Sequence, residues 1–99
     1  MKIQSYDFKK DDLELKAVEI IFPNTTLLLL AGYDAFFMCG ALNPAVYGQR
    51  EVICGCAKGV KTIDDLFEAQ IYDVTNYAKS KGIDSGMKVY EAFSLLKKE

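Results

Sequence analysis

Histidine is absent from the sequence, and its absence excludes more chemistry than any other feature of the composition. Histidine is the commonest general base, a frequent metal ligand and the activator of the nucleophile in Ser-His and Cys-His enzymes. Tryptophan is also absent, and the chain has only two prolines and three cysteines. An odd, small number of cysteines indicates free thiols in a reducing compartment and not a disulfide framework.

Neither sign of charge dominates the chain. Twelve Lys and Arg stand against fourteen Asp and Glu, which gives a net charge of −2. Such a chain has no positive field to attract nucleic acid or an anionic membrane, so we expect neither as a partner. The basic pairs at residues 9–10 and 97–98 are followed by acidic residues, and we interpret them as solvated surface.

Long apolar segments are lacking as well. Residues 1–10 contain no apolar core of a secretory signal. The most apolar stretch, residues 27–42, is interrupted by Gly32, Asp34 and Gly40 and is shorter than the ~20 residues of a membrane-spanning helix. The sequence therefore predicts a cytoplasmic protein.

The 99 residues are enough for one domain, and the 51% of apolar residues are enough for its core. Apolar and polar residues alternate from Leu13 to Ala17, and three further apolar runs follow between turn residues. These patterns predict strands over 13–22, 25–31, 35–41 and 51–57, the first three forming an antiparallel meander. Gly55 in the fourth run indicates a bulge or a close approach of another backbone.

From residue 59 onward the pattern becomes helical. Thr62 followed by Asp65 is typical of a capped helix start, and the sequence predicts a brief helix there. Two further helices are predicted over about 73–81 and 85–97, and a short helical turn at 43–48. We therefore expect a single α+β domain over residues 1–99, β-rich over 1–58 and helical over 59–99, with two to three C-terminal helices packed on an N-terminal antiparallel sheet.

The candidate ligand-binding residues are Cys39, Gly40 and Asn43. Cys39 lies just before the predicted turn at 43–48, where main-chain donors can hold an anion or lower a thiol pKa, and Gly40 lets a ligand approach the backbone. The alternatives are a Cys buried as a small hydrophobic residue and an Asn43 that caps the turn. Because no acid-base pair accompanies these residues, no catalytic residue is assigned.

Cys54 and Cys56 are the weak candidates for a metal site. Side chains alternate along a strand, so both sulfurs are expected on one face, where they can share a soft metal ion. A complete site needs about four ligands, and the alternative is that both are small core residues. We expect no cofactor. Tyr72, Tyr77 and Tyr90 are interpreted as core and interface aromatics.

Three groups of residues in this order resemble the YunC-like family, a small bacterial and archaeal domain of unknown function (DUF1805). They are Phe37-Met38-Cys39-Gly40-Ala41-Leu42-Asn43, then Gly59-Val60-Lys61-Thr62-Ile63-Asp64-Asp65-Leu66 with Ala69, and Gly82-Ile83 with Gly86-Met87 and Glu91-Ala92. Family members often carry Asp where this chain has Asn43. The resemblance implies a tetramer assembled through the β-rich N-terminal region, but no activity or cofactor.

The apolar run Thr25 to Ala31 agrees with that implication, because covering it with another chain is one way to bury it. We therefore expect a homo-oligomer, assembled through its N-terminal strands, that acts as a small-ligand-binding or protein-interaction module. The alternative function is a thiol-dependent enzyme or redox protein that uses Cys39.

Overall fold

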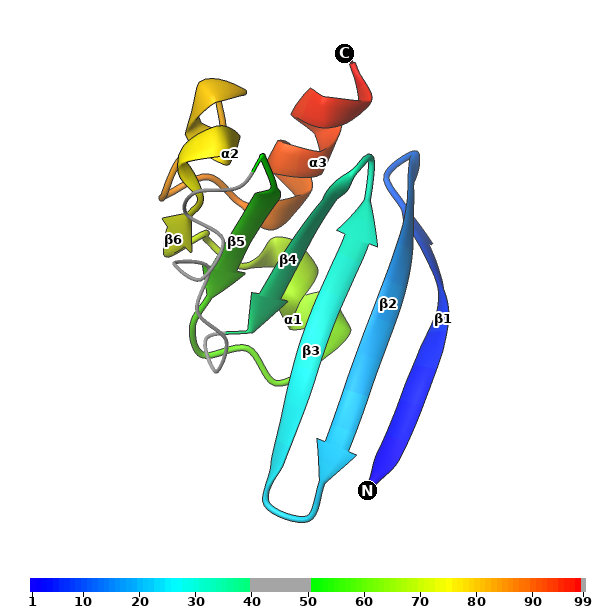
Figure 1. Cartoon of the computed structure of the whole chain (residues 1–99). Helices are drawn as coiled ribbons and strands as arrows, with labels where there is room; N and C mark the ends of the chain where they lie inside the picture. The colour runs from blue at the N-terminus through cyan, green and yellow to red at the C-terminus, as the bar shows by residue number, and fades with distance from the viewer. Residues whose placement is uncertain (40–50, 99) are drawn as a thin grey trace.

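The computed structural model describes residues 1–39 and 51–98 of the chain. The chain forms a six-stranded sheet and three short helices, and the last strand lies between the first two helices in the chain (Figure 1). The strands are β1 (Lys2–Lys10), β2 (Leu13–Phe22), β3 (Thr25–Gly32), β4 (Ala35–Cys39), β5 (Ile53–Ala57) and β6 (Asp73–Val74), and the helices are α1 (Ile63–Glu68), α2 (Asn76–Ser80) and α3 (Val89–Lys97).

The strands lie in the sheet in chain order, β1-β2-β3-β4-β5-β6. All neighbouring pairs are antiparallel except β4 and β5, which are parallel. The α+β class and the antiparallel meander predicted for the first three runs, now β2, β3 and β4, are therefore confirmed, and the parallel pairing of β5 with β4 is an addition to the prediction. Alternation of apolar residues fixes which face of a strand is buried but carries no information about strand direction.

Three two-residue hairpins align the first four strands. The chain turns between β1 and β2 at Asp11 and Asp12, and between β3 and β4 at Tyr33 and Asp34. All four residues have φ between 51° and 65°, as type I′ hairpin turns require. The predicted strands at 13–22 and 25–31 are confirmed, and the later two begin and end within the predicted runs over the described residues.

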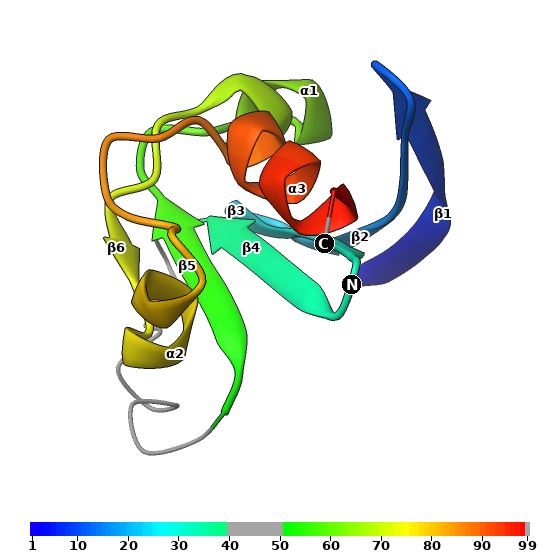
Figure 2. The same ribbon diagram turned by 90° about the horizontal axis from the view of Figure 1, so that it is seen from above.

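Helices α1 and α3 cover one face of the sheet, which we call the inner face, and α2 lies beside β5 (Figure 2). Leu15, Ala17, Leu30 and Phe37 are buried on the inner face. The ring of Phe37 meets that of Phe93 on α3 edge-on, with centroids 5.0 Å apart. The hydrophobic core therefore lies between the sheet and these two helices.

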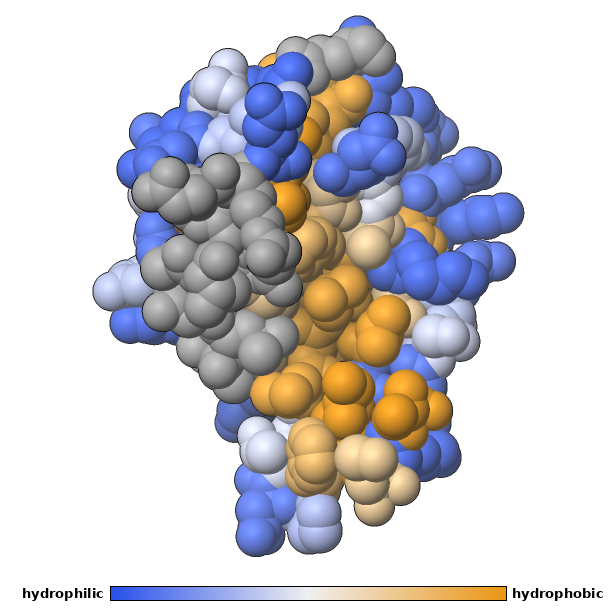
Figure 3. Space-filling model, viewed as in Figure 1, coloured by the Kyte–Doolittle hydropathy of each residue, from blue (hydrophilic) through white to orange (hydrophobic). Residues whose placement is uncertain are grey.

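The opposite face, which we call the outer face, is apolar over part of β1, β2 and β3. Ile20 pairs with Ile3 on one side and Leu27 on the other, and Val18 pairs with Leu29. Ile3 is 62% exposed, and the other four are half-buried. Figure 3 shows the resulting hydrophobic area along the middle and lower sheet. No helix among the described residues is long and apolar enough to cross a lipid bilayer.

The helix predictions are correct in number but not in every boundary. α1 starts as predicted, with the Asp65 amide donating to Thr62 Oγ1 at 3.0 Å. Instead of one helix over 73–81, residues 73–74 form β6, and α2 begins after Thr75, whose Oγ1 accepts a hydrogen bond from the Ala78 amide.

The third helix, α3, begins at Val89 and not near Ser85. The Glu91 carboxylate accepts a hydrogen bond from the Lys88 amide and caps the helix there. The turn predicted at 43–48 lies outside the described residues.

Candidate functional site

The parallel pair β4 and β5 brings two strand ends to one edge of the sheet, with Cys39 opposite Ala57. Crevices beyond the carboxyl ends of parallel strands are common ligand sites, because the chain leaves neighbouring strands in different directions there. After β5 the chain turns at Lys58 and Gly59 toward α1. Of the predicted ligand-binding residues, Cys39 lies at this edge, while Gly40 and Asn43 lie outside the described residues.

Cys39 is buried, with 5% of its surface exposed, and belongs to the main hydrophobic core. The Leu28 amide donates to Cys39 Sγ at 3.4 Å. The thiol is thus enclosed by the core and accepts a hydrogen bond from the main chain. This is the environment of a core residue and not of a solvated nucleophile.

Cys54 and Cys56 lie on the same face of β5, as their spacing predicts, and pack with Met38 in a separate small cluster. Burial raises the pKa of the Cys54 thiol from its ordinary value of 9.0 to about 12. Burial, followed by the Asp73 carboxylate, also raises the pKa of Cys56, although Lys58 acts in the opposite direction. Both thiols therefore stay protonated at neutral pH, whereas metal ligands and nucleophiles need the thiolate.

A metal site would need additional ligands beside the two sulfurs. Across residues 1–39 and 51–98, no group of three or more Cys, Asp and Glu side chains is placed to hold a metal ion. The reason for the Cys-Gly-Cys sequence lies in packing. A Cβ on Gly55 would lie 3.0 Å from both the Asp73 carbonyl oxygen and the Phe37 ring, so β6 approaches β5 closely only because residue 55 is glycine.

Thr75 fixes the start of β5 to α2. Its side chain is buried, and its Oγ1 donates to the Val52 carbonyl at 2.6 Å and accepts from the Cys54 amide at 3.4 Å and the Ala78 amide at 3.2 Å. One hydroxyl thus joins the strand that carries Cys54 and Cys56 to the helix beside it. It is the only buried polar side chain in the described part of the chain.

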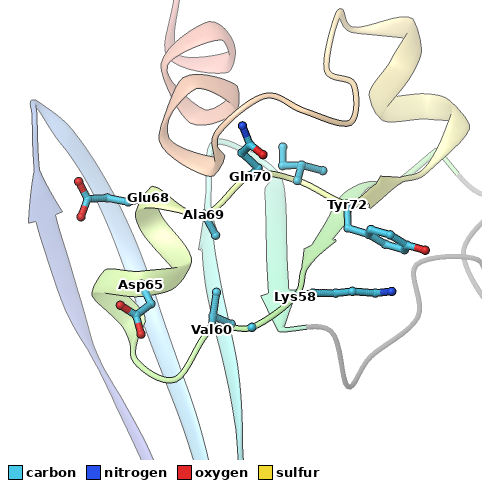
Figure 4. Close-up of a pocket in the computed structure, with 9 residues that line it drawn as sticks. Lys58, Val60, Asp65, Glu68, Ala69, Gln70 and Tyr72 are labelled. Carbon is cyan, nitrogen blue, oxygen red and sulfur yellow. The ribbon is translucent and has the colours of Figure 1, made fainter.

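An open hollow of about 560 Å³ lies beyond the carboxyl end of β5, between residues 58–60 and residues 69–72 (Figure 4). Lys58 and Tyr72 lie side by side at one end, with the Lys58 ammonium 3.7 Å from the centre of the Tyr72 ring. Asp65 and Glu68, both on α1, lie at the other end. The edge therefore carries separated positive and negative groups.

Sequence reasoning does not identify this hollow. Of the three tyrosines interpreted as core and interface aromatics, Tyr77 and Tyr90 pack against the core, whereas Tyr72 is 58% exposed and lines this hollow. Lys58 and Gln70 follow no motif. They line a common hollow only because α1 returns the chain to the end of β5, and a local pattern cannot show such a contact.

Three comparisons with known proteins identify a family, a relative and a similar structure. Residues 38–96 match the family model described as "Domain of unknown function (DUF1805)". The uncharacterized protein YunC of Bacillus subtilis (strain 168) is 38% identical over 80 residues, which cover 77% of this chain and 79% of that protein. The crystal structure of a protein of unknown function, TA1206 from Thermoplasma acidophilum, is similar with a TM-score of 0.85. It is 24% identical and the match covers 96% of this chain and 93% of that one, which supports the fold alone. With the family model matching more than half of its length, the chain belongs to the YunC-like family of DUF1805 proteins.

Proposed function

We propose that this chain is a homo-oligomeric binding and interaction module of the cytoplasm that associates with copies of itself through the outer face of β1, β2 and β3. The observation that carries the proposal is the apolar outer face around Ile20, which pairs with Ile3 and Leu27. Large contiguous apolar areas on a protein surface mark interaction sites.

The border of this apolar area supports an interface. Toward the β1–β2 turn, the same face carries charged residues, with Lys16 opposite Asp7 and Glu14 opposite Lys9. Lys16 Nζ lies 2.8 Å from Asp7 Oδ1. An apolar centre with a charged border is the usual composition of a protein interface.

A second copy is the partner that suits this face best. Two sheets pack face to face at about 10 Å when their apolar side chains interdigitate, and a twofold axis lets one patch cover the same patch on its partner. A tetramer, as the family resemblance implies, needs one further contact. The edge of β1 supplies a candidate, because all nine of its residues pair with β2 on one side.

Charge placed at the centre of the outer face tests the proposal. We expect Ile20→Lys to lower the mass measured by light scattering from a multiple of 11.1 kDa toward that of one chain, because a lysine cannot be buried there without a partner. Ser85→Lys, the matched control, adds the same charge at an exposed loop position and should keep the wild-type mass. An Ile20→Lys variant with a native circular dichroism spectrum and an unchanged mass would contradict the proposal.

A thiol-dependent enzyme or redox protein using Cys39 is the competing proposal. The burial of Cys39 speaks against it, because a nucleophile must reach its substrate. Among the described residues, the hydrogen bond to its sulfur comes from the Leu28 amide, which is a donor and cannot act as a base.

A further inference from the structure

The hollow beyond β5 has an apolar centre and an open rim. Val60 and Ala69 point toward one another across it (Figure 4), and the buried Ile71 also lines it. Gly59 lies on the rim with φ of +75°, and a Cβ built there would meet no atom within 4 Å. The hollow therefore has room for another group above its apolar centre.

One wall of the hollow is an extended segment with an unused hydrogen-bonding edge. Gln70 forms an antiparallel bridge with Lys88. The two hydrogen bonds of this bridge are made by the residues on either side of Gln70 and Lys88. The Ile71 amide donates to the Met87 carbonyl at 2.7 Å, and the Val89 amide donates to the Ala69 carbonyl at 3.0 Å.

In such a pair the central residue directs its own N–H and C=O to the opposite side. For Gln70 this is the side of the hollow, on which Val60 and Lys58 lie (Figure 4). Within residues 1–39 and 51–98, neither main-chain group of Gln70 has a hydrogen-bond partner. One donor and one acceptor, spaced as in a strand, thus face the open space.

The charged side chains at the two ends of the hollow differ in sign, so they favour one orientation of a bound ligand. The Lys58 ammonium and the Tyr72 ring form one end. Glu68, an exposed carboxylate with no ion pair among the described residues, and Asp65 form the other end. A ligand that fits this arrangement carries an acidic group near Lys58 and a basic group near α1.

We propose that this hollow binds an extended peptide segment of a partner protein, which pairs through its backbone with the N–H and C=O of Gln70. An acidic residue of that segment lies at the Lys58 and Tyr72 end, and a basic residue lies at the Asp65 and Glu68 end. Short apolar side chains between them contact Val60 and Ala69. Strand addition of this kind draws its affinity from main-chain hydrogen bonds and its specificity from the flanking side chains. The site does not depend on self-association, because it is built from a different part of the fold.

Two blocked tetrapeptides test the proposal, Lys-Val-Val-Glu and Glu-Val-Val-Lys, each acetylated and amidated. They are titrated to millimolar concentration into the isotope-labelled protein, and amide signals are followed by NMR. We expect one of them to move the Gln70 amide signal in a saturable manner, the direction of its chain showing whether the pairing is parallel or antiparallel. N-methylation of the valines of that peptide should abolish the change, because it removes the N–H that donates to the Gln70 carbonyl oxygen.

Lys58→Glu should weaken binding of that peptide about three- to tenfold, since it places two like charges at one end of the hollow. Lys79→Glu, an equal change of charge on α2, is the matched control and should bind as the wild type does. The proposal would be overturned if neither peptide produced a saturable shift of the Gln70 amide signal. It would also be overturned if Lys58→Glu bound the peptide as tightly as the wild type does, or if the shifts were confined to the outer face. Light scattering on the same samples measures self-association separately, so the two proposals can fail independently.

Discussion

Ile20 on β2 lies directly opposite Leu27 on β3, on the face of the sheet opposite to that of the buried Leu28 and Leu30. Both side chains are half-buried, and Ile3 extends the row to β1. The same strands bury Ala17 and Leu30 on the inner face. These strands therefore carry apolar residues on both faces, although the helices cover only one.

Thr75 is predicted to contribute more to stability than its size implies. Thr75→Val removes the hydroxyl that serves Val52, Cys54 and Ala78, and leaves buried main-chain groups without partners. We expect the free energy of unfolding in urea to fall by about 1–3 kcal/mol. Thr75→Ser keeps the hydroxyl and is the matched control. A valine variant as stable as the serine variant would contradict this role of the hydroxyl.

The buried thiol of Cys54 makes stability depend on pH in the alkaline range. Because its pKa is raised from 9.0 to about 12 in the fold, the folded chain holds this proton more tightly than the unfolded chain does. Its contribution to stability is complete below pH 9 and is lost as the pH rises from about 9 toward 12.

Chemical denaturation at a series of pH values measures this effect. The decrease in unfolding free energy above pH 9 should be smaller in Cys54→Ala than in the wild type. The raised pKa values of Tyr6 and Cys56 act in both proteins, so the difference isolates Cys54. Parallel curves for the two proteins would refute a buried, protonated thiol at this position.

Cys39 is expected to resist alkylation in the folded protein. Its sulfur is buried and accepts the Leu28 amide, so iodoacetamide at neutral pH should modify it much more slowly than in urea-unfolded protein. Mass spectrometry of the peptide that contains Cys39 gives the rate in each state. Equal rates in the two states would revive the thiol-dependent function.

Much of the fold follows from local patterns. The alternation from Leu13 to Ala17 identifies β2, and Thr62 with Asp65 identifies the start of α1. β1 escapes prediction because an edge strand is mostly exposed, and only Gln4 and Phe8 are half-buried along it. β6 escapes it because two residues paired with β5 leave no periodic signal.

The candidate site is less predictable than the fold. The sequence indicates that Cys54 and Cys56 share a face, since this depends only on alternation within one strand. It does not indicate that β4 and β5 are parallel, or that Lys58 meets Tyr72. Both facts depend on where the chain returns after leaving a strand, and residues far apart in the sequence decide that.

The mass of the native protein in solution tests the central claim most directly. Light scattering over a range of concentrations, read against multiples of the 11.1 kDa chain mass, should show a stable assembly of two or four chains. A mass of one chain at every concentration would mean that the apolar outer face around Ile20 and Leu27 does not bind a second copy, and would contradict the proposed self-association.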